Sequence, residues 1–461
     1  MGATNPRQPL RAISLFSNCG AGDVGFAEAG FQFEVMAELD PRRLAVALLN
    51  HPKATGIPGD LRVTLPSVIA SYRRRAGATA PALLAACPPC QGMSSAQSGR
   101  GLGSDPDAGS KDERNLLVKV IADAVNELNP RTIVVENVQA FLMRKVRHPR
   151  TGVAISAANY LIDELADRYA VYPLSTDLAD FGIPQSRKRS FLTFILRTEP
   201  ALEMLSQRGK VPYPWASHSN SHSGPVSLES ALKSFGLDEL DARNKITAVG
   251  DLPMHRVPIW SEQLYRMVNA IPPSSGLSAW DNLECLTCGT RARDPKRVRC
   301  SRCRSVLPRP ITKNSDGELR LVRGFHSSYR RMSPDEPAAT ITTASGHVGS
   351  DRTIHPWENR VLSPLECALL QTFPLHFKWG DALEEWGHTN VRAMIGEAVP
   401  PLFTKKHGRT ISQLLRGVPP RLALDDIDRR VQAAFRSLGR SSRDAILNEN
   451  VNVSSSTIKV T

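Results

Sequence analysis

The stretch RAISLFSNCGAGDVGF, residues 11–26, decides the fold. Residues 11–16 have the apolar character of a short buried strand, and the small residues 17–25 lead into a helix near 26–29. Small residues at such a junction let backbone N–H groups approach a ligand at the helix N-terminus. This strand–turn–helix unit predicts an α/β, doubly wound (Rossmann-like) domain with a cofactor loop.

Two alternatives remain open for this loop. Gly20, Gly22 and Gly25 satisfy the pattern G-x-G-x-x-G, which is also typical of nicotinamide dinucleotide enzymes. A tight turn between a strand and a helix, with no ligand, would need the same small residues.

Acidic residues follow the next two predicted strand ends. Glu38 stands near the end of a strand over residues 33–40, and Asp60 precedes Leu61 after another short connection. An acid at such a strand end can hold ribose hydroxyls. With the Gly20 loop these residues predict an adenosyl pocket, although either carboxylate alone is also typical of a solvated loop.

A candidate nucleophile lies in AACPPCQGMS, residues 85–94, which follows an apolar run. Cys90 comes after Pro89 at the mouth of a strand, a position suited to attack on a substrate. Residues 92–111 are rich in Gly and Ser and predict a lid. Cys87 and Cys90 also form a C-x-x-C pair, which is typical of redox or metal sites.

A candidate proton donor is Glu136, in the β-rich run of residues 131–138. It directly follows Ile-Val-Val, so its carboxyl is expected at the end of a buried strand, near enough to a pocket for acid–base chemistry. A strand-end acid paired with a lysine or arginine is the structural alternative.

Polar residues alternate in FGIPQSRKR, residues 181–189, at the start of a strand expected to run to residue 196. Gln185, Arg187 and Arg189 should then share one face of that strand. Such a face suits a phosphate or the polar edge of a base. A solvated basic edge strand is the common alternative.

Composition points to a polyanionic partner. The 461 residues include 58 Lys and Arg against 45 Asp and Glu, a net charge of +13. Eight cysteines are too few for a disulfide framework, and the N-terminus carries no apolar signal segment. No stretch is long and apolar enough to span a membrane. We therefore expect a cytoplasmic protein with reduced thiols.

Four cysteines predict a structural zinc site. Cys285 and Cys288 form one C-x-x-C knuckle, and Cys300 and Cys303 form another, with eleven residues between the two. This spacing lets four thiolates close on one Zn²⁺, with chance or disulfides as the alternatives. Basic residues surround the four cysteines, and these are Arg291, Arg293, Lys296, Arg297, Arg299, Arg302 and Arg304. They suit contact with phosphate groups, although a solvated basic loop would have the same composition.

In its ordered motifs the chain resembles the C5-cytosine-specific DNA methyltransferases. The motifs stand in the family's order from Phe16-Ser17-x-Cys19-Gly20 to Gly396-Glu-Ala-Val-Pro-Pro401. Between these ends lie Glu38, Asp60, Pro89-Cys90-Gln91, Asp112-x-Arg114-Asn115, Glu136-Asn137-Val138, Gln185-x-Arg187-x-Arg189, Arg331-Met-Ser-Pro, Glu336-Pro-Ala-Ala-Thr-Ile-Thr and Leu370-Gln-Thr-Phe-Pro374. The chain departs from the family at Asn18 and Ala21, where glycine is usual, and at Glu397 in the last motif. Asparagine tolerates positive φ.

The resemblance implies an enzyme that flips a cytosine out of double-stranded DNA and methylates it from S-adenosyl-L-methionine. It implies that Cys90 attacks C6 while Glu136 acts at N3, that Arg189 contacts the polar edge of the ring, and that Gln185 and Arg187 support the site. Cys87 would be a bystander. The cofactor-binding residues so implied are Phe16, Ser17, Cys19, Gly20, Ala21, Glu38, Asp60, Leu61 and Val399.

The expected domains are a catalytic part over residues 1–200, a target-recognition domain with the zinc ribbon over 201–350, a catalytic return over 351–416, and a C-terminal helix and flexible tail over 417–461. We expect a role in restriction-modification or related bacterial defence, with a cognate defence component as partner and the protein associated with the nucleoid. An RNA cytosine methyltransferase and a catalytically silent DNA-binding regulator are the rival hypotheses.

Overall fold

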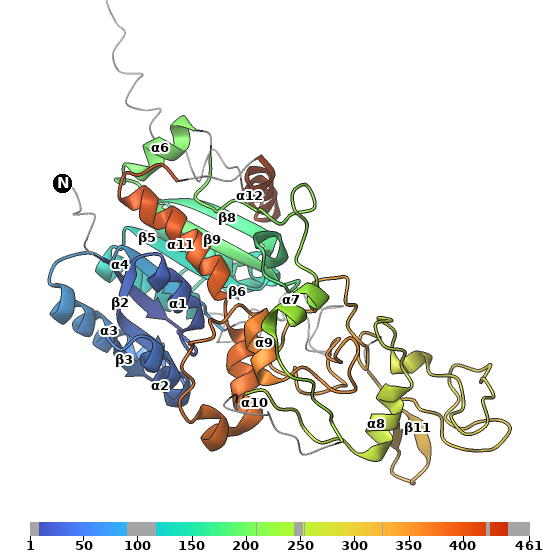
Figure 1. Ribbon diagram of the computed structural model, residues 1–461. Coiled ribbons are helices and arrows are strands. Elements are labelled where there is room, and N and C mark those ends of the chain that lie inside the picture. The colour runs from blue at the N-terminus through green and yellow to red at the C-terminus, as the bar shows by residue number, and fades with distance from the viewer. Residues whose placement is uncertain are drawn as a thin grey trace, which may run out of the picture. The chain divides into compact units, whose positions relative to one another are not determined.

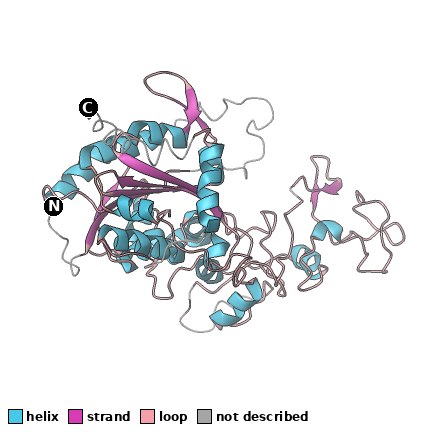
Figure 2. Ribbon diagram, turned by 90° about the horizontal axis from the view of Figure 1, so that it is seen from above, coloured by secondary structure: helices cyan, strands magenta, loops and turns pink. Residues whose placement is uncertain are grey.

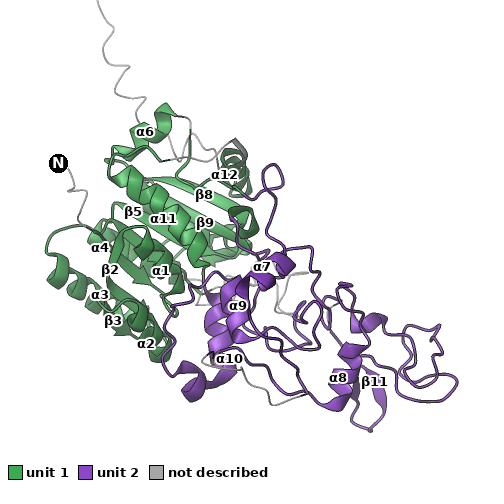
Figure 3. Cartoon of the chain, in the orientation of Figure 1, with its two compact units in different colours: residues 1–181, 188–217, 399–461 green, residues 182–187, 218–398 purple. Residues whose placement is uncertain are grey.

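The computed structural model describes residues 9–89, 117–208, 210–243, 252, 254–324, 326–420 and 425–440. The chain divides into two compact units, shown in different colours in Figure 3. Unit 1 comprises Met1–Phe181, Lys188–Ser217 and Val399–Thr461, and unit 2 comprises Gly182–Arg187 and His218–Ala398. Helices of the described residues were searched for a membrane span, and none is long and apolar enough.

A seven-stranded sheet forms the centre of unit 1 (Figures 1 and 2). Five neighbouring strands are parallel, and β9 runs antiparallel to both of its neighbours. In sheet order the strands are β3 (Thr55–Pro58), β2 (Phe31–Glu38), β1 (Leu10–Leu15), β4 (Leu83–Ala86), β5 (Thr132–Asn137), β9 (Lys188–Leu196) and β8 (Tyr169–Asp177). The sequence prediction of an α/β domain built on a mostly parallel sheet is therefore confirmed.

Helices cover both faces of this sheet (Figure 2), as expected for strands buried on both sides. One row consists of α3, α4 and α5, which pack on one another in that order, while α1 packs on α11. The helices of unit 1 are α1 (Ala21–Glu28), α2 (Pro41–Asn50), α3 (Leu61–Ala76), α4 (Leu117–Leu128), α5 (Ala157–Leu165), α6 (Ala201–Gln207), α11 (Pro401–Leu415) and α12 (Asp425–Ser437). A small hairpin of β6 (Lys145–Arg147) and β7 (Ala154–Ser156) also belongs to it.

The strand order reverses between β1 and β4. From β1 the chain proceeds to β2 and β3 on one side, and then crosses to β4 and β5 on the other side. In doubly wound sheets ligands bind outside the carboxyl ends of the strands at such a switch point. The fold thus directs attention to the loops that follow Leu15 and Ala86.

An early and a late segment of the chain meet where α1 packs on α11. A Cβ added at Gly25 of α1 would stand 2.1 Å from Oγ1 of Thr404 and 2.2 Å from the carbonyl oxygen of Pro401. Thr404 also donates a hydrogen bond of 2.7 Å to the carbonyl of Gly22. The close approach that glycine permits therefore fastens the start of α11 beside the predicted cofactor loop.

Unit 2 has little regular secondary structure for its length, and buried arginines hold it together. Arg331 is 1% exposed and donates to the carbonyls of Ile271, His355 and Glu358. Each such guanidinium satisfies several backbone carbonyls that no sheet or helix pairs. The elements of unit 2 are α7 (Leu228–Phe235), α8 (Glu262–Asn269), β10 (Ile311–Lys313), β11 (Leu319–Leu321), α9 (Pro364–Leu370) and α10 (Ala382–Glu397).

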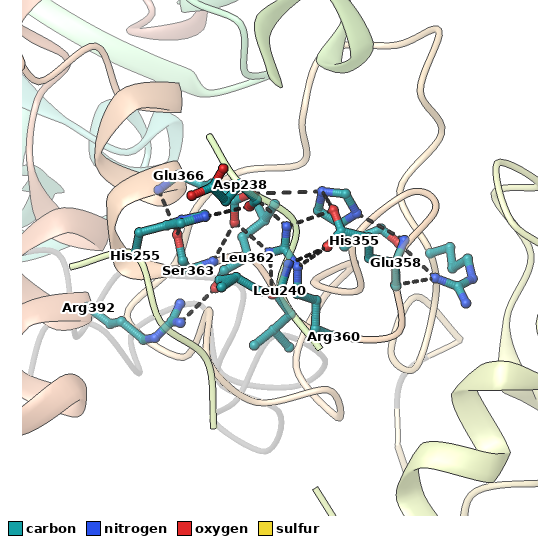
Figure 4. Close-up of polar contacts among 12 residues, drawn as sticks. Asp238, Leu240, His255, His355, Glu358, Arg360, Leu362, Ser363, Glu366 and Arg392 are labelled. Atoms are coloured by element: carbon teal, nitrogen blue, oxygen red, sulfur yellow. Dashed lines mark hydrogen bonds and ion pairs between the residues drawn. The ribbon is translucent and has the colours of Figure 1, made fainter. Parts of the chain in front are cut away.

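A buried ion-pair network surrounds Arg360 in unit 2 (Figure 4). The Arg360 guanidinium lies 2.7 Å from Oε2 of Glu366 and 2.8 Å from Oε2 of Glu358. Glu366 also forms a capping box with Ser363 at the start of α9, and His255 lies 3.0 Å from the Ser363 hydroxyl. Because every charged member has a partner, the network fixes segments far apart in sequence without leaving a charge uncompensated.

Apart from Gly182–Arg187, which belong to unit 2, the chain leaves unit 1 after Ser217 and re-enters it at Val399, whereas we expected the recognition domain over residues 201–350. The segment after residue 350 contains α9 and α10, which pack on each other, and α9 also packs on α7. These helices therefore belong to the compact unit 2 and not to unit 1, which contains the sheet.

Candidate active site

Three neighbouring strands of unit 1 end side by side at the switch point. Leu15, the last residue of β1, is the register partner of Ala86, the last residue of β4. Ala86 in turn is the partner of Val135 in β5, so Glu136 follows one position beyond. The predicted cofactor loop, the segment leading to Cys90 and the predicted proton donor thus leave adjacent strands.

The loop after β1 has an unusual backbone. Phe16, Asn18 and Gly20 have φ values of 59°, 48° and 74°, in the left-handed region that few side chains tolerate. Asn18 replaces the glycine usual in the family, and asparagine is among the residues that adopt this conformation most readily. Strained backbone of this kind is concentrated at functional sites. The Ser17 hydroxyl lies 3.2 Å from the carbonyl of Ala37, which ties the loop to β2.

Buried groups brace the same loop from below. Cys19 is fully buried, and burial raises the pKa of its thiol to about 12, so it stays protonated. His51 of the segment after α2 lies 3.1 Å from the carbonyl oxygen of Gly20, and burial lowers its pKa. Cys19 was predicted as a cofactor contact; His51 was not singled out, and only its position after a helix could have suggested it.

Glu38 and Asp60 take different parts in the structure. Glu38 accepts hydrogen bonds from the backbone N–H of Asn18 at 2.8 Å and of Asp40 at 3.1 Å, so it secures the loop. Asp60 caps α3 by accepting from the backbone N–H of Arg62, and its carboxylate also pairs with the Arg62 guanidinium. The hydrogen bonds from Arg62 lower the pKa of Asp60. Leu61 is the buried first residue of α3.

The start of α11 lies against the predicted cofactor loop. A Cβ added at Gly22 would stand 3.2 Å from Cβ of Val399. Ala21 is the buried first residue of α1, and its N-cap Gly20 carries no side-chain capping bond. This helix N-terminus is therefore built of small residues, a setting that suits a ligand.

Glu136 is buried at the end of β5 and is held at both carboxylate oxygens. Nε of Arg189 lies 3.0 Å from Oε1, and the thiol of Cys87 donates to Oε2 at 2.8 Å. The ion pair expected as the structural alternative is present. The expectation that Cys87 is a bystander is wrong, because its thiol contacts the proposed proton donor.

Cys90 and the lid over residues 92–111 lie outside the described residues. Cys90 follows Pro89 directly in the chain. The segment before it is fixed, since Nδ2 of Asn137 donates a hydrogen bond of 2.9 Å to the carbonyl of Pro88. The backbone that leads to Cys90 is thereby tied to the residue after Glu136.

Gln185 and Arg187 do not share a strand face with Arg189, contrary to the expectation from sequence. β9 begins at Lys188, so both residues precede it and belong to unit 2. Arg187 donates to the carbonyls of Ile341, Gly396 and Ala398, at 3.1, 2.8 and 3.0 Å. Gln185 accepts from the backbone N–H of Ile341 at 2.8 Å. Both side chains are buried and hydrogen-bond to backbone groups. The prediction failed because the alternation of polar residues does not reveal at which residue the strand pairing begins.

The four predicted metal ligands come together in unit 2. The sulfur atoms of Cys285 and Cys303 are 3.5 Å apart, those of Cys288 and Cys300 are 3.6 Å apart, and all four lie within 4.8 Å of one another. The hydroxyl of Thr290 beside Cys288 lowers the pKa of that thiol to about 6. A cluster of four sulfurs with a readily ionised member is suited to a soft divalent metal.

Comparison with known proteins gives one consistent family. The family described as C-5 cytosine-specific DNA methylase matches residues 10–413. The Type II methyltransferase M1.HgaI of Avibacterium volantium is 27% identical over 414 residues, which cover 88% of this chain and 99% of that protein. The Type II methyltransferase M.DdeI of Desulfomicrobium norvegicum is 24% identical over 96% of this chain and 97% of its own length.

A solved structure supports the fold alone. The crystal structure of the S. pombe Dnmt2 methyltransferase superimposes with a TM-score of 0.50 and 15% identity, covering 89% of this chain and 99% of that one. The sheet and its covering helices are thus an arrangement already known among methyltransferases.

Proposed function

The chain belongs to the C-5 cytosine-specific DNA methylase family and is a DNA cytosine methyltransferase, and from this premise we propose which residues perform the reaction. The observation that supports the proposal best is the meeting of three strand ends. The cofactor loop, the Cys87–Pro89 segment that leads to Cys90, and Glu136 leave β1, β4 and β5 as direct neighbours.

In this proposal the cofactor loop and its surroundings hold S-adenosylmethionine, which supplies an electrophilic methyl group. The N-terminus of α1 and the left-handed backbone over residues 16–20 offer N–H groups, and Glu38, which accepts from the N–H groups of Asn18 and Asp40, places a carboxylate beside them. The remaining contacts proposed are Ser17, Cys19, Ala21, Asp60, Leu61 and Val399, of which Cys19 acts from beneath the loop.

The chain's own groups carry the steps on the base. The Cys90 thiolate forms a bond to C6 of the cytosine, and Glu136 supplies a hydrogen bond or proton to N3, so that negative charge does not accumulate on the ring. C5 thereby becomes nucleophilic enough to take the methyl group. Loss of the C5 proton to solvent water, return of any N3 proton to Glu136 and departure of the Cys90 sulfur as a thiolate restore the aromatic ring and the free enzyme.

Arg189 has a second task in this scheme. Its Nε pairs with Glu136, and its guanidinium retains further N–H donors for the polar edge of the cytosine. Gln185 and Arg187 act at a distance, by holding the segments at 341 and 396–398 in unit 2. Because C5 and C6 are shielded in a duplex, the target base is flipped out of the helix.

Bisulfite sequencing tests the roles of Cys90 and Glu136. DNA from cells that express the wild type should carry 5-methylcytosine at defined sites, and DNA from Cys90→Ser and Glu136→Gln cells should have lost it. Cys367→Ser is the matched control, since this buried thiol of α9 lies in unit 2. Methylation patterns identical to the wild type in Cys90→Ser cells would refute the role of Cys90 as nucleophile.

Parallel assays on duplex DNA and on RNA of the same sequence would reveal an RNA substrate.

We further propose that the cysteine cluster holds a structural Zn²⁺. Four sulfurs bound tetrahedrally at the usual Zn–S length lie about 3.8 Å from one another, close to the separations seen here. The apolar core around the cluster is small, and consists of Leu283, Ala292, Leu307 and the cysteines themselves. So small a core requires a metal staple to fold.

Metal analysis tests the zinc proposal directly. The purified protein should contain one zinc ion per chain, Cys300→Ser should lose it, and Cys367→Ser should keep it. A folded wild-type protein without zinc would refute the proposal.

The proposed zinc ribbon also presents a basic surface to DNA. All seven basic residues named around it in the sequence are exposed, whereas Arg309 turns inward and donates to the carbonyls of Trp280, Pro295 and Arg297. Replacing Arg297, Arg299 and Arg302 with Gln should weaken DNA binding and flatten its dependence on salt. Arg74→Gln, at an exposed position on α3, should change neither.

The relatives are named Type II methyltransferases, which supports a role beside a restriction nuclease. DNA modified by this enzyme should then resist cleavage by a nuclease of the same recognition site. Equal cleavage of modified and unmodified DNA would count against that role.

A further inference from the structure

The carboxylate of Glu136 is held by two groups of different chemistry. Oε1 lies 3.0 Å from Nε of Arg189, which is charged, and Oε2 lies 2.8 Å from Sγ of Cys87, which is a neutral donor. The ion pair is largely shielded from water, since the Arg189 and Glu136 side chains are only 14% and 8% exposed, and the contact with the half-buried Cys87 is partly shielded. The mechanism proposed above uses Arg189 and Glu136 and leaves the thiol of Cys87 without a role.

Cys87 is fixed before it meets Glu136. Its backbone N–H donates to the carbonyl of Leu15 at 3.3 Å, which ties it to the end of β1. Pro88 and Pro89 follow, and a proline restricts the backbone of the residue before it. The Pro88 carbonyl also accepts from Asn137 at 2.9 Å. The thiol therefore stands on a segment joined to both neighbouring strands.

Two contacts on different oxygens do what one contact does not. The terminal torsion of a glutamate side chain is broad, so a single partner leaves the carboxylate free to turn about its last bond. Arg189 alone would fix the position of Oε1 and leave Oε2 to rotate. A donor on Oε2 sets the plane of the carboxylate, and so sets which lone pairs remain for a substrate.

A thiol suits this second position better than another cation would. A second positive charge beside Glu136 would hold the carboxylate in its ionised form and oppose any proton that it must deliver. The thiol is a weak neutral donor, so it can orient the carboxylate without adding charge.

We propose that Cys87 is a positioning residue for the methyl-transfer reaction, whose thiol orients the Glu136 carboxylate against Arg189. The proposal rests on the catalytic role proposed for Glu136. It assigns Cys87 a contact with Glu136 alone, and not with the base or the cofactor.

Single-turnover methylation of duplex DNA by Cys87→Ala and Cys87→Ser tests this role. Cys87→Ala should lower the rate of methyl transfer about 3- to 10-fold, the scale of one ordinary hydrogen bond, since a thiol is a weak donor, with KM for DNA and for S-adenosylmethionine unchanged. Cys87→Ser retains a donor and should restore most of the rate. Equal rates for the wild type and Cys87→Ala, or equal losses in the Ala and Ser variants, would overturn the proposal.

Two comparisons separate this proposal from the one it rests on. Glu136→Gln should lower the rate far more than Cys87→Ala, and adding Cys87→Ala to Glu136→Gln should cause no further loss. If Glu136→Gln is as active as the wild type, the role of Glu136 is wrong. If Glu136→Gln is inactive while Cys87→Ala is fully active, only the role of Cys87 is wrong.

The melting temperatures of the variants, and a control substitution at another buried thiol, distinguish a loss of positioning from a folding defect. Cys367 is buried in unit 2, where Nη1 of Arg392 lies 3.5 Å from its sulfur, and it has no bond to Glu136. Cys367→Ala removes a buried thiol in contact with a charged group and should leave the rate of the folded enzyme unchanged. A loss as large as that of Cys87→Ala would show a general effect of thiol removal and overturn the proposal.

Discussion

The backbone N–H of Asn18 donates a hydrogen bond of 2.8 Å to Oε2 of Glu38, so that the end of β2 holds the cofactor loop in its left-handed conformation. Oε1 of the same carboxylate accepts from the N–H of Asp40 at 3.1 Å. Glu38→Gln would turn an amide NH₂ toward one of these two donors. We expect it to weaken binding of S-adenosylmethionine about tenfold, which titration calorimetry would measure.

Glu34→Gln is the matched control on the same strand. Glu34 pairs with Arg11 at 3.0 Å and with Arg75 at 2.8 Å, and neither residue belongs to the loop. This change should lower the melting temperature and leave the affinity for S-adenosylmethionine unaltered. Equal affinities in the wild type and Glu38→Gln would show that the loop does not depend on the Glu38 carboxylate.

A second prediction concerns the packing of α1 on α11. In Gly25→Ala the new Cβ would overlap Oγ1 of Thr404 and backbone atoms of α11. The backbone atoms cannot move aside as the end of a flexible side chain could. We expect a loss of about 2–3 kcal/mol in the free energy of unfolding, measured in urea. In Gly22→Ala the new Cβ would come nearest to Val399, whose Cβ is 3.2 Å away, and the change should cost less. Equal losses in the two variants would contradict this account of the contact.

The sequence was sufficient to predict the elements whose pattern is local. The strand predicted over residues 11–16, the turn of small residues after it and the strand that contains Glu136 form as expected, because apolar runs and turn residues act over a few positions. The four cysteines also meet as their spacing predicts. Each of these features depends on residues that are close together in the chain.

Pairings between distant segments could not be predicted in this way. Gln185 and Arg187 bond to backbone more than 150 residues later in the chain, and no pattern around residue 185 indicates those partners. The contact of Cys87 with Glu136 spans 49 residues and arises only because β4 and β5 are neighbours.

Net charge was likewise an incomplete guide. Several arginines that contribute to the excess of positive charge are buried in unit 2, where they donate to carbonyls or pair with glutamates; these are Arg187, Arg309, Arg331, Arg360 and Arg392. They stabilise an irregular fold and are not exposed to a polyanion. The exposed residues of the cysteine ribbon remain the stronger candidates for phosphate contact.

A third prediction follows from Asp23, which is buried in α1 and accepts a hydrogen bond of 2.8 Å from the Ser14 hydroxyl. Burial raises the pKa of Asp23 from 3.8 to about 7, and the bond from Ser14 opposes only part of that rise. Since the folded state keeps its proton where the unfolded state has lost it, stability should fall as pH rises from about 4 to 7 and then level off.

Asp23→Asn should remove this dependence. At pH 8 the variant should be more stable than the wild type by about 2–4 kcal/mol, because a neutral amide replaces a buried charge. Urea unfolding at pH 5 and pH 8 would measure the difference. An advantage of the same size at both values would show that Asp23 does not ionise between them.

The last prediction concerns the acid limb of stability in unit 2. Burial alone would raise the pKa of Glu366, but the ion pair with Arg360 outweighs it and lowers that pKa from 4.5 to about 2. Burial, together with the Arg360 charge, lowers the pKa of His355 well below 6.5. Below the ordinary pKa of each group, the unfolded chain therefore binds a proton that the folded unit does not bind. Stability should therefore fall as pH drops below about 6.5, through His355, and fall further from about 4.5 toward 2, through Glu366.

Glu366→Gln separates the two steps. It leaves Arg360 with Glu358 alone and should cost about 3–5 kcal/mol at pH 7, the usual effect of breaking a buried pair. It should also abolish the decline between pH 4.5 and 2 while keeping the one that starts near 6.5. Five of the six tryptophans lie in unit 2, so their fluorescence reports its unfolding. Glu384→Gln breaks an exposed pair with Arg256 and should change stability by less than about 1 kcal/mol. If Glu366→Gln retains the full acid decline of the wild type, the ion pair with Arg360 does not set the acid stability of this unit.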